Sequence, residues 1–290
     1  MKIPLISDIK RFSVHDGDGI RTTVFFKGCS LKCVWCHNPE SLDKKSQIAY
    51  FADKCINCGE CTFVCKNNAH LMLNDEHFLN HELCSSCGIC EDVCLGNAIK
   101  IYGKSYSVDE LVEILLKDKD FYENSGGGVT FSGGECLLYP EYCCEIAKKL
   151  KEYNVHVAID TCGFVKKDAF DIVAPYTDLF LYDIKAIDSA VHVKCTGKDN
   201  DIILNNLRYI DNLNIPIYIR IPYVPDFNDC EIDKIAEFIK PFININRVEV
   251  LAYHNYASSR YNALNIKNTL PKTLPTDVEV EVAQSKFIIK

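Results

Sequence analysis

Residues 20–36 read IRTTVFFKGCSLKCVWC, and this stretch says the most about the fold. Its first seven residues are β-branched or aromatic apart from Arg21, which predicts a buried β-strand. The strand runs directly into a loop that holds Cys29, Cys33 and Cys36. Parallel sheets bind their ligands at the carboxyl ends of the strands, so we expect a metal site on this loop.

Strands and helices alternate along the second part of the chain. Ser107 to Glu110 form a capping box ahead of the apolar-periodic helix LVEILLKD. We predict further strands at residues 129–131, 155–159, 178–183, 215–221 and 247–251. Helical segments are predicted between them, near residues 140–153, 167–174, 202–212 and 232–238. Counting the first strand, these are six β/α units, which predict an α/β fold in which a parallel sheet curls into a partial (β/α)6 barrel.

The first cysteine group has the spacing C-x3-C-x2-C. Three thiolates can hold three irons of a [4Fe–4S] cube, and the fourth iron is then open to an outside ligand. The alternatives are a zinc site or three structural thiols. Zinc would need a fourth ligand, and His37 adjoins Cys36 too closely to complete a tetrahedron. The spacing therefore favours a cluster with an open site.

A second group of cysteines is an internal repeat with a period of 29 residues. Cys55-x2-Cys58-Gly-x-Cys61-x3-Cys65 recurs as Cys84-x2-Cys87-Gly-x-Cys90-x3-Cys94. This is the bacterial two-cluster pattern, in which the fourth cysteine of each half ligates the other cluster. We therefore assign Cys55, Cys58, Cys61 and Cys94 to one cube, and Cys65, Cys84, Cys87 and Cys90 to the other. Zinc ribbons are the alternative.

The repeat divides the chain into two predicted units. Residues 53–101 are expected to form a ferredoxin-like insert with two [4Fe–4S] clusters, between the first and second β/α units. Residues 1–52 and 102–290 are expected to form the barrel. Cubes that are fully ligated by protein cannot bind substrate, so the insert is expected to relay electrons toward the open cube; a structural role is the alternative.

The first cysteine motif, with Trp35 just before its last cysteine, resembles the signature of radical S-adenosylmethionine (SAM) enzymes. The longer string GDGIR at 17–21, with FFKGC at 25–29 and CHN at 36–38, resembles the glycyl radical enzyme activases. This resemblance implies that the chain cleaves SAM reductively and that the 5′-deoxyadenosyl radical takes a hydrogen from a glycine of a partner enzyme. It implies three [4Fe–4S] clusters, SAM, and an electron donor such as flavodoxin or ferredoxin.

The resemblance also implies which residues bind SAM. Gly133, Gly134 and Glu135 resemble the motif that receives the methionine amine. Asp160-Thr-Cys-Gly resembles the Asp-Thr-Asn-Gly of activases, with Cys162 in place of Asn, and implies contact with a monovalent cation or the methionine carboxylate. For each of these residues alone, a turn, a helix cap or a surface ion pair is the alternative.

Three further contacts are implied by the same resemblance. Asp183-Ile184-Lys185 resembles an Asp-Leu-Lys segment that contacts SAM, with Lys185 paired to its carboxylate. Tyr253-His254 resembles the Pro-Tyr-His that reaches the nucleoside. The residues that flank Cys36, Trp35 and His37, are expected to pack on the adenine, or else to fill core.

Composition excludes several classes of protein. A net charge of −8 argues against nucleic-acid binding, and no stretch approaches the apolar length of a membrane span. The N-terminal residues lack the pattern of a signal peptide, so we expect a cytoplasmic protein whose 17 cysteines stay reduced. The six cysteines outside the clusters, which we expect to be buried, are Cys136, Cys143, Cys144, Cys162, Cys195 and Cys230.

Two rival functions and one unassigned segment remain. The rivals are a radical SAM enzyme that acts directly on a small molecule or peptide, and a pure electron carrier; a carrier would not need the three-cysteine loop or the barrel. Residues 270–290 contain two prolines and the alternating DVEVEV, unlike the long helix and short strand that end the activases. No element is predicted there.

Overall fold

The computed structural model describes residues 1–287, and its main body is a seven-stranded sheet in the order β1-β2-β7-β8-β9-β10-β11. Every neighbouring pair from β2 to β11 is parallel. The parallel strands are β2 (Arg21–Phe26), β7 (Gly128–Gly133), β8 (His156–Thr161), β9 (Leu179–Asp183), β10 (Ile217–Tyr223) and β11 (Ile245–Ala252). The predicted α/β class and parallel sheet are confirmed. The sheet is open, and the described residues form no closed barrel.

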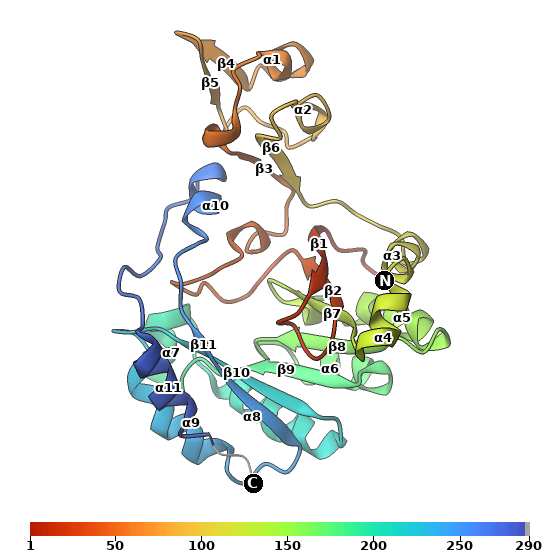
Figure 1. Cartoon of the computed structure of the whole chain (residues 1–290), viewed down its shortest axis with the longest axis vertical. Helices are drawn as coiled ribbons and strands as arrows, with labels where there is room; N and C mark the ends of the chain where they lie inside the picture. Colours follow the sequence, from red (N-terminus) through yellow and green to blue (C-terminus); the bar gives the residue numbers. More distant parts are fainter. Residues whose placement is uncertain (288–290) are drawn as a thin grey trace.

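The core lies between the outer face of this sheet and a row of helices (Figure 1). Alternate residues of a strand point to opposite faces, so Ile217, Ile219 and Ile221 of β10 enter this core while Arg220 faces the concave side. The helices of the main body are α3 (Val108–Leu116), α4 (Lys119–Ser125), α5 (Pro140–Glu152), α6 (Asp168–Val173), α7 (Ser189–Thr196), α8 (Asp201–Ile210) and α9 (Ile232–Ile239). The predicted capping box is present at the start of α3, between Ser107 and Glu110.

One strand of the sheet was not predicted. β1 (Ile6–Ser13) pairs antiparallel with β2 and forms the edge of the sheet. Its register shifts twice and Phe12 has a φ of 59°, so its side chains do not keep the period of two that marks a strand in sequence. The loop after β1 crosses the concave side, where Asp18 lies 2.9 Å from Arg247 of β11. The sheet therefore curls far enough for its first loop to contact its last strand.

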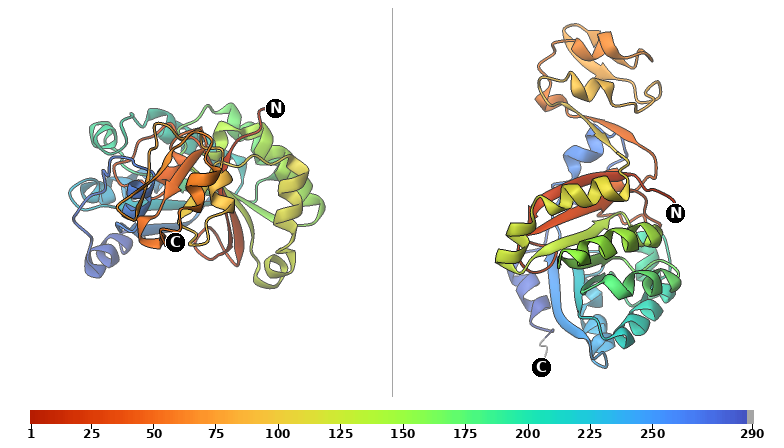
Figure 2. Two further views of the ribbon diagram at one scale, coloured as in Figure 1. Left: turned by 90° about the horizontal axis from the view of Figure 1, so that it is seen from above. Right: turned by 90° about the vertical axis from the view of Figure 1, so that its right-hand side faces the viewer.

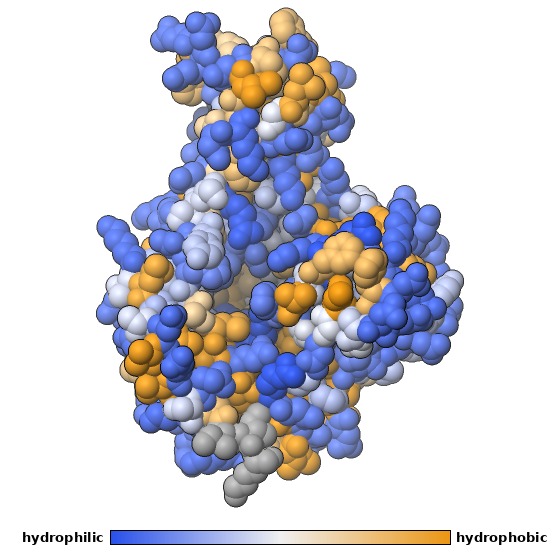
Figure 3. All heavy atoms as spheres, viewed as in Figure 1, coloured by the Kyte–Doolittle hydropathy of each residue, from blue (hydrophilic) through white to orange (hydrophobic). Residues whose placement is uncertain are grey.

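Figure 2 shows a small unit that stands out from the main body. An antiparallel pair connects it to the main body, and a short hairpin lies farther out (Figure 1). Its elements are β3 (Gln47–Tyr50), α1 (Glu60–Val64), β4 (His70–Leu73), β5 (Glu76–Leu79), α2 (Ile89–Asp92) and β6 (Ile99–Tyr102). The predicted boundaries at residues 53 and 101 fall inside this unit, which we call the insert. It exposes several large apolar side chains, including Ile56, Phe63 and Leu95, and hydrophobic atoms are visible on it in Figure 3.

The C-terminal segment covers the last strand of the sheet. Helix α10 (Ser258–Ala263) packs near β3, and α11 (Asp277–Gln284) packs on β11. The DVEVEV stretch is helical because Thr276 and Glu279 form a capping box at its start. Gln284 then donates its amide N–H to Val248 O and accepts from Val250 N, so its side chain pairs with the open edge of β11. Residues 288–290 of the unassigned segment lie outside the described residues.

No helix within residues 1–287 is both long and apolar enough to cross a membrane.

Candidate active site

A pocket with about 210 Å³ of free volume opens at the carboxyl ends of the parallel strands, on the concave side of the sheet. It is lined by the three-cysteine loop after β2 and by the ends of β7, β8, β9, β10 and β11. The predicted site residues that line it are Cys29, Cys33, Trp35, Cys36, His37, Gly133, Gly134, Asp160, Asp183, Lys185 and Tyr253. Residues far apart in sequence therefore meet around one space. Glu135, Ile184 and His254 are not among its lining residues.

The three-cysteine loop presents its thiols in a buried environment. Burial raises the pKa of the Cys33 thiol to about 12 and that of Cys36 well above its usual value. Free thiols at Cys33 and Cys36 would therefore stay protonated, whereas the hydrogen bond with Cys162 lowers the pKa of the Cys29 thiol. A bound metal ion would deprotonate all three. The loop is held by backbone and side-chain contacts, since Tyr261 of α10 donates its hydroxyl to Cys36 O at 3.1 Å. Three soft sulfur donors beside an open space fit an iron–sulfur cluster better than a hard cation.

The two glycines at the end of β7 allow the backbone to approach the cysteine loop. A Cβ on Gly133, whose φ is +113°, would lie 2.1 Å from Phe26 N. A Cβ on Gly134 would lie 2.3 Å from Gly28 O, one residue before the first cysteine. Only glycine fits at both positions, so the end of β7 is pressed against the loop and its backbone groups border the pocket.

The carboxylate of Glu135 is buried and joins the ends of two strands, β7 and β8. Its oxygens accept hydrogen bonds from Leu137 N at 3.0 Å, Cys162 N at 2.9 Å and the Thr161 hydroxyl at 2.9 Å. The Cys162 thiol donates to the same group at 3.0 Å. Burial raises the pKa of Glu135, and these four donors oppose that shift. Glu135 thus fixes the end of β7 against the end of β8.

Charged side chains line the concave wall of the pocket. Lys185 Nζ lies 2.7 Å from Asp183 Oδ2, and Arg220 Nη1 lies 3.1 Å from Asp160 Oδ1. Burial raises the pKa of Asp160 to about 6, although Arg220 acts in the opposite direction. The Ser132 hydroxyl donates to Asp160 Oδ2 at 2.6 Å. Buried charges of both signs beside an open space suit a zwitterionic ligand such as an amino acid.

Arg220 is a site residue that the sequence-based prediction missed. It lies in the middle of the IYIRIPY strand, β10, and lines the pocket with a largely buried side chain. A charged residue inside a buried strand is the same signal that singled out Asp160 and Asp183. Those two residues lie at strand ends, where ligands are expected, whereas Arg220 lies within its strand.

Aromatic rings stack on the rim of the pocket. The His37 ring lies 4.1 Å from the ring of His254, and that ring lies 4.4 Å from Tyr256. His37 Nε2 donates to His254 O at 2.8 Å, and burial lowers the pKa of His37 to about 4, so this imidazole is neutral at pH 7. Trp35 lines the pocket and packs edge-on against Phe227. The rim thus offers flat apolar faces of the kind that stack on a nucleobase.

Ile184 has a different environment from its neighbours. Asp183 and Lys185 line the pocket, whereas Ile184 is fully buried in the core between sheet and helices. Its side chain therefore packs on the outer face of the sheet.

The insert contains two further cavities, and each is lined by one of the predicted sets of four cysteines. Cys55, Cys58, Cys61 and Cys94 border the first cavity, together with Tyr50, His77 and Ile99. Cys65, Cys84, Cys87 and Cys90 border the second, together with Ile48 and His70. The fourth cysteine of each half therefore lies with the other half's first three. Four sulfur donors around each cavity fit a fully ligated cube.

The six remaining cysteines differ in burial. Cys136, Cys143, Cys162 and Cys195 are buried as predicted and Cys144 is half-buried, but Cys230 is exposed, so the prediction is wrong there. Cys230 belongs to a short turn ahead of α9, outside the core.

Comparison with known proteins gives a consistent result. A model of the radical SAM superfamily matches residues 23–239. The chain is 46% identical to the trans-4-hydroxy-L-proline dehydratase activating enzyme of Clostridioides difficile, over 90% of this chain and 88% of that protein. It is 41% identical to the benzylsuccinate synthase activating enzyme of Thauera aromatica, over 91% and 82% of the two chains. Among solved structures, a domain of a pyruvate-formate lyase-activating enzyme from Bacteroides vulgatus is 30% identical, covering 56% of this chain and 92% of that one, with a TM-score of 0.47.

Proposed function

The chain belongs to the glycyl radical enzyme activating enzymes of the radical SAM superfamily, and on this premise we propose how its residues perform that activation. The protein cleaves SAM reductively to methionine and a 5′-deoxyadenosyl radical, which abstracts a hydrogen atom from a glycine of a partner enzyme. The residues that bind SAM, the number of clusters and the source of the electrons are our proposals.

We propose that Cys29, Cys33 and Cys36 hold a [4Fe–4S] cluster with one open iron. When bound, this cluster supplies the electron that cleaves the sulfonium of SAM. The chain's own contribution is to bind and orient SAM and to exclude water. The observation that carries the proposal is that the three cysteines line the same pocket as the glycines and charged residues of four other strands.

The wall of the pocket suggests how SAM is oriented. The backbone at Gly133 and Gly134 borders the cysteine loop, where the methionine amine is proposed to bind. Lys185 and Arg220 are the cations proposed to face the methionine carboxylate, each already paired with a carboxylate of the protein. Asp160 and Asp183 are proposed to hold a monovalent cation. His37, His254 and Trp35 are proposed to contact the adenine through their flat faces.

We propose that the insert holds two further [4Fe–4S] clusters in the two cysteine-lined cavities, which makes three clusters in the chain. Their crossed ligand sets support a ferredoxin-like pair that relays electrons from a donor such as flavodoxin or ferredoxin. Such clusters require a reducing compartment, so the cytoplasm is the proposed location. All seventeen cysteines are free in the described part of the chain, in line with this.

Two measurements test these proposals. Iron and sulfide analysis of anaerobically reconstituted protein should give about 12 irons per chain for three cubes, whereas about 4 would show that the insert holds none. The reduced protein should then be mixed with SAM and trans-4-hydroxy-L-proline dehydratase, the partner named by one close relative. A glycyl radical signal in electron paramagnetic resonance (EPR) is expected only when a true partner is present. If 5′-deoxyadenosine forms rapidly without any protein partner, a small-molecule substrate becomes the better interpretation.

A further inference from the structure

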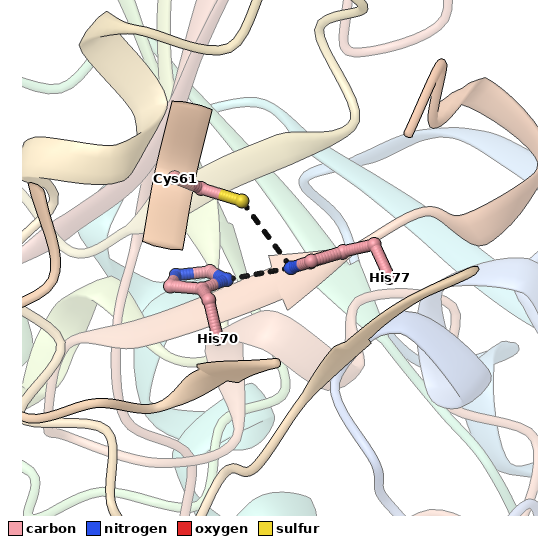
Figure 4. A group of neighbouring side chains, drawn as sticks. All are labelled: Cys61, His70 and His77. Atoms are coloured by element: carbon pink, nitrogen blue, oxygen red, sulfur yellow. Dashed lines mark hydrogen bonds between the residues drawn. The ribbon is translucent and has the colours of Figure 1, made fainter. Parts of the chain in front are cut away.

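Two buried histidines lie between the two cysteine-lined cavities of the insert. His77 of β5 borders the cavity of Cys55, Cys58, Cys61 and Cys94, and His70 of β4 borders the other. His70 is 4% exposed and His77 is 5% exposed. Neither histidine belongs to a cysteine motif of the sequence. Figure 4 shows the two imidazoles together with Cys61, which reaches toward them from α1.

The contacts within this group are short. His77 Nε2 lies 3.3 Å from Cys61 Sγ and 2.9 Å from His70 Nδ1. The backbone of His77 is held as well, since the Tyr50 hydroxyl donates to His77 O at 3.0 Å. Tyr50 also packs edge-on against the His77 ring, 4.5 Å between centroids. The imidazole is therefore positioned by its neighbours, with one nitrogen aimed at a proposed cluster ligand.

The chemistry of the ring decides which nitrogen carries the hydrogen. A neutral imidazole has one N–H, on either Nδ1 or Nε2. His77 Nδ1 is buried and has no hydrogen-bond partner among the described residues, so a hydrogen there would be an unsatisfied donor. A hydrogen on Nε2 instead has the sulfur of Cys61 and the Nδ1 of His70 as acceptors. A cluster-bound thiolate is the more negative of the two, which favours Nε2–H pointing to Cys61.

The internal repeat shows that this contact has no counterpart in the other half. Cys61 corresponds to Cys90, 29 residues later. In the β4–β5 hairpin, His77 pairs with Met72. At the equivalent place in the β3–β6 pair, Ile48 pairs with Ile101, which is 29 residues after Met72. His77 therefore occupies the position that Ile48 occupies beside the other cavity. One half of the repeat carries an N–H donor, and the other carries an aliphatic side chain.

We propose that His77 is a positioning and tuning residue that makes the two insert clusters inequivalent, by donating a hydrogen bond from Nε2 to the sulfur of Cys61. This inference rests on the proposed clusters of the insert. Reduction adds one electron from the donor, and so one negative charge, to a cube, while the hydrogen stays on His77. An N–H directed at a ligand sulfur stabilises the reduced state more than the oxidised state, so it raises the reduction potential. The cube of Cys55, Cys58, Cys61 and Cys94 is thus the more easily reduced of the two.

The test is an EPR-monitored potentiometric titration of the full-length, anaerobically reconstituted enzyme. SAM identifies the open cube, because only that signal should change when SAM is added. The other two signals belong to the insert, and in the wild type they should have different midpoints. In His77→Ile, which copies the residue of the other half, the higher midpoint should fall. At the midpoint potential of the wild type, the ratio of reduced to oxidised cluster in the variant should be about tenfold lower. This ratio corresponds to a midpoint that is lower by about 59 mV for a one-electron couple.

Two further variants make the result specific. His70→Ile keeps the donor to Cys61 and should leave that midpoint nearly unchanged. Ile48→His places a donor beside Cys90 and should raise the lower midpoint, which tests the idea even if His77→Ile loses its cluster. The inference is overturned if about 12 irons remain in His77→Ile and both insert midpoints stay at their wild-type values. It is equally overturned if Cys61, His70 and His77 prove to bind one zinc ion. An insert that binds no iron would instead contradict the proposed three-cluster function.

Discussion

Replacement of Glu135 by glutamine is expected to destabilise the fold and to weaken SAM binding. Both carboxylate oxygens accept a backbone N–H, from Leu137 at 3.0 Å on one side and from Cys162 at 2.9 Å on the other. A glutamine has one oxygen and one NH2 group, so either orientation places its NH2 against one of these N–H donors. No rotation of the amide removes this conflict.

The size of the effect follows from the bonds that are lost. A hydrogen bond to a charged group contributes about 1.5–3 kcal/mol, and a buried donor without a partner costs about 1–3 kcal/mol. Glutamine also removes the cost of a buried charge, which offsets part of this loss. The net decrease in the free energy of unfolding should be about 2–3 kcal/mol. Because Glu135 joins the ends of β7 and β8, the same change should displace Gly133 and Gly134 and weaken SAM binding.

The assay combines urea unfolding with SAM binding to the reconstituted enzyme. Cys162→Ala is the matched control, since it removes one thiol donor to Glu135 and leaves both backbone donors satisfied. It should cost only about 1 kcal/mol. A Glu135→Gln protein with wild-type stability and wild-type SAM affinity would refute the assigned role of this carboxylate.

Three other changes should have distinct outcomes. Gly134→Ala should abolish SAM cleavage while iron is still bound at the insert, because its Cβ would lie 2.3 Å from Gly28 O; product analysis by liquid chromatography checks this. Gln284→Ala should lower the free energy of unfolding by about 1–3 kcal/mol because two hydrogen bonds to β11 are lost; chemical denaturation measures this. Cys94→Ala should alter the cube whose midpoint responds to His77, and Cys65→Ala the other cube; the opposite assignment in EPR would contradict the crossed ligand sets.

Patterns with a fixed period predicted most of the main body. The parallel strands are rich in β-branched and aromatic residues, and their order along the chain followed from the alternation with helices. Where local geometry breaks the period, prediction failed. β1 has two register shifts, so its side chains lose the alternation of a strand. DVEVEV alternates like a strand but forms α11, because the capping box of Thr276 and Glu279 and the contacts of Gln284 with β11 favour a helix.

The candidate site was likewise predicted only in part. The spacing of the cysteines predicted which of them lie together, and the structure places the two predicted sets of four around separate cavities. A motif does not give the direction of each side chain, so it could not predict that the carboxylate of Glu135 binds Cys162 N or that the side chain of Ile184 lies in the core. The sequence did not identify Arg220 or His77, because the role of each depends on a tertiary contact. Arg220 contacts Asp160, and His77 contacts Cys61.

The EPR spectrum of the reduced, anaerobically reconstituted enzyme, recorded before and after SAM is added, tests the open iron site most directly. We predict that one cluster signal changes, and that this signal is absent from a protein in which Cys29, Cys33 and Cys36 are all replaced by alanine. A spectrum in which no cluster responds to SAM, although the iron of all three cubes is present, would contradict the account.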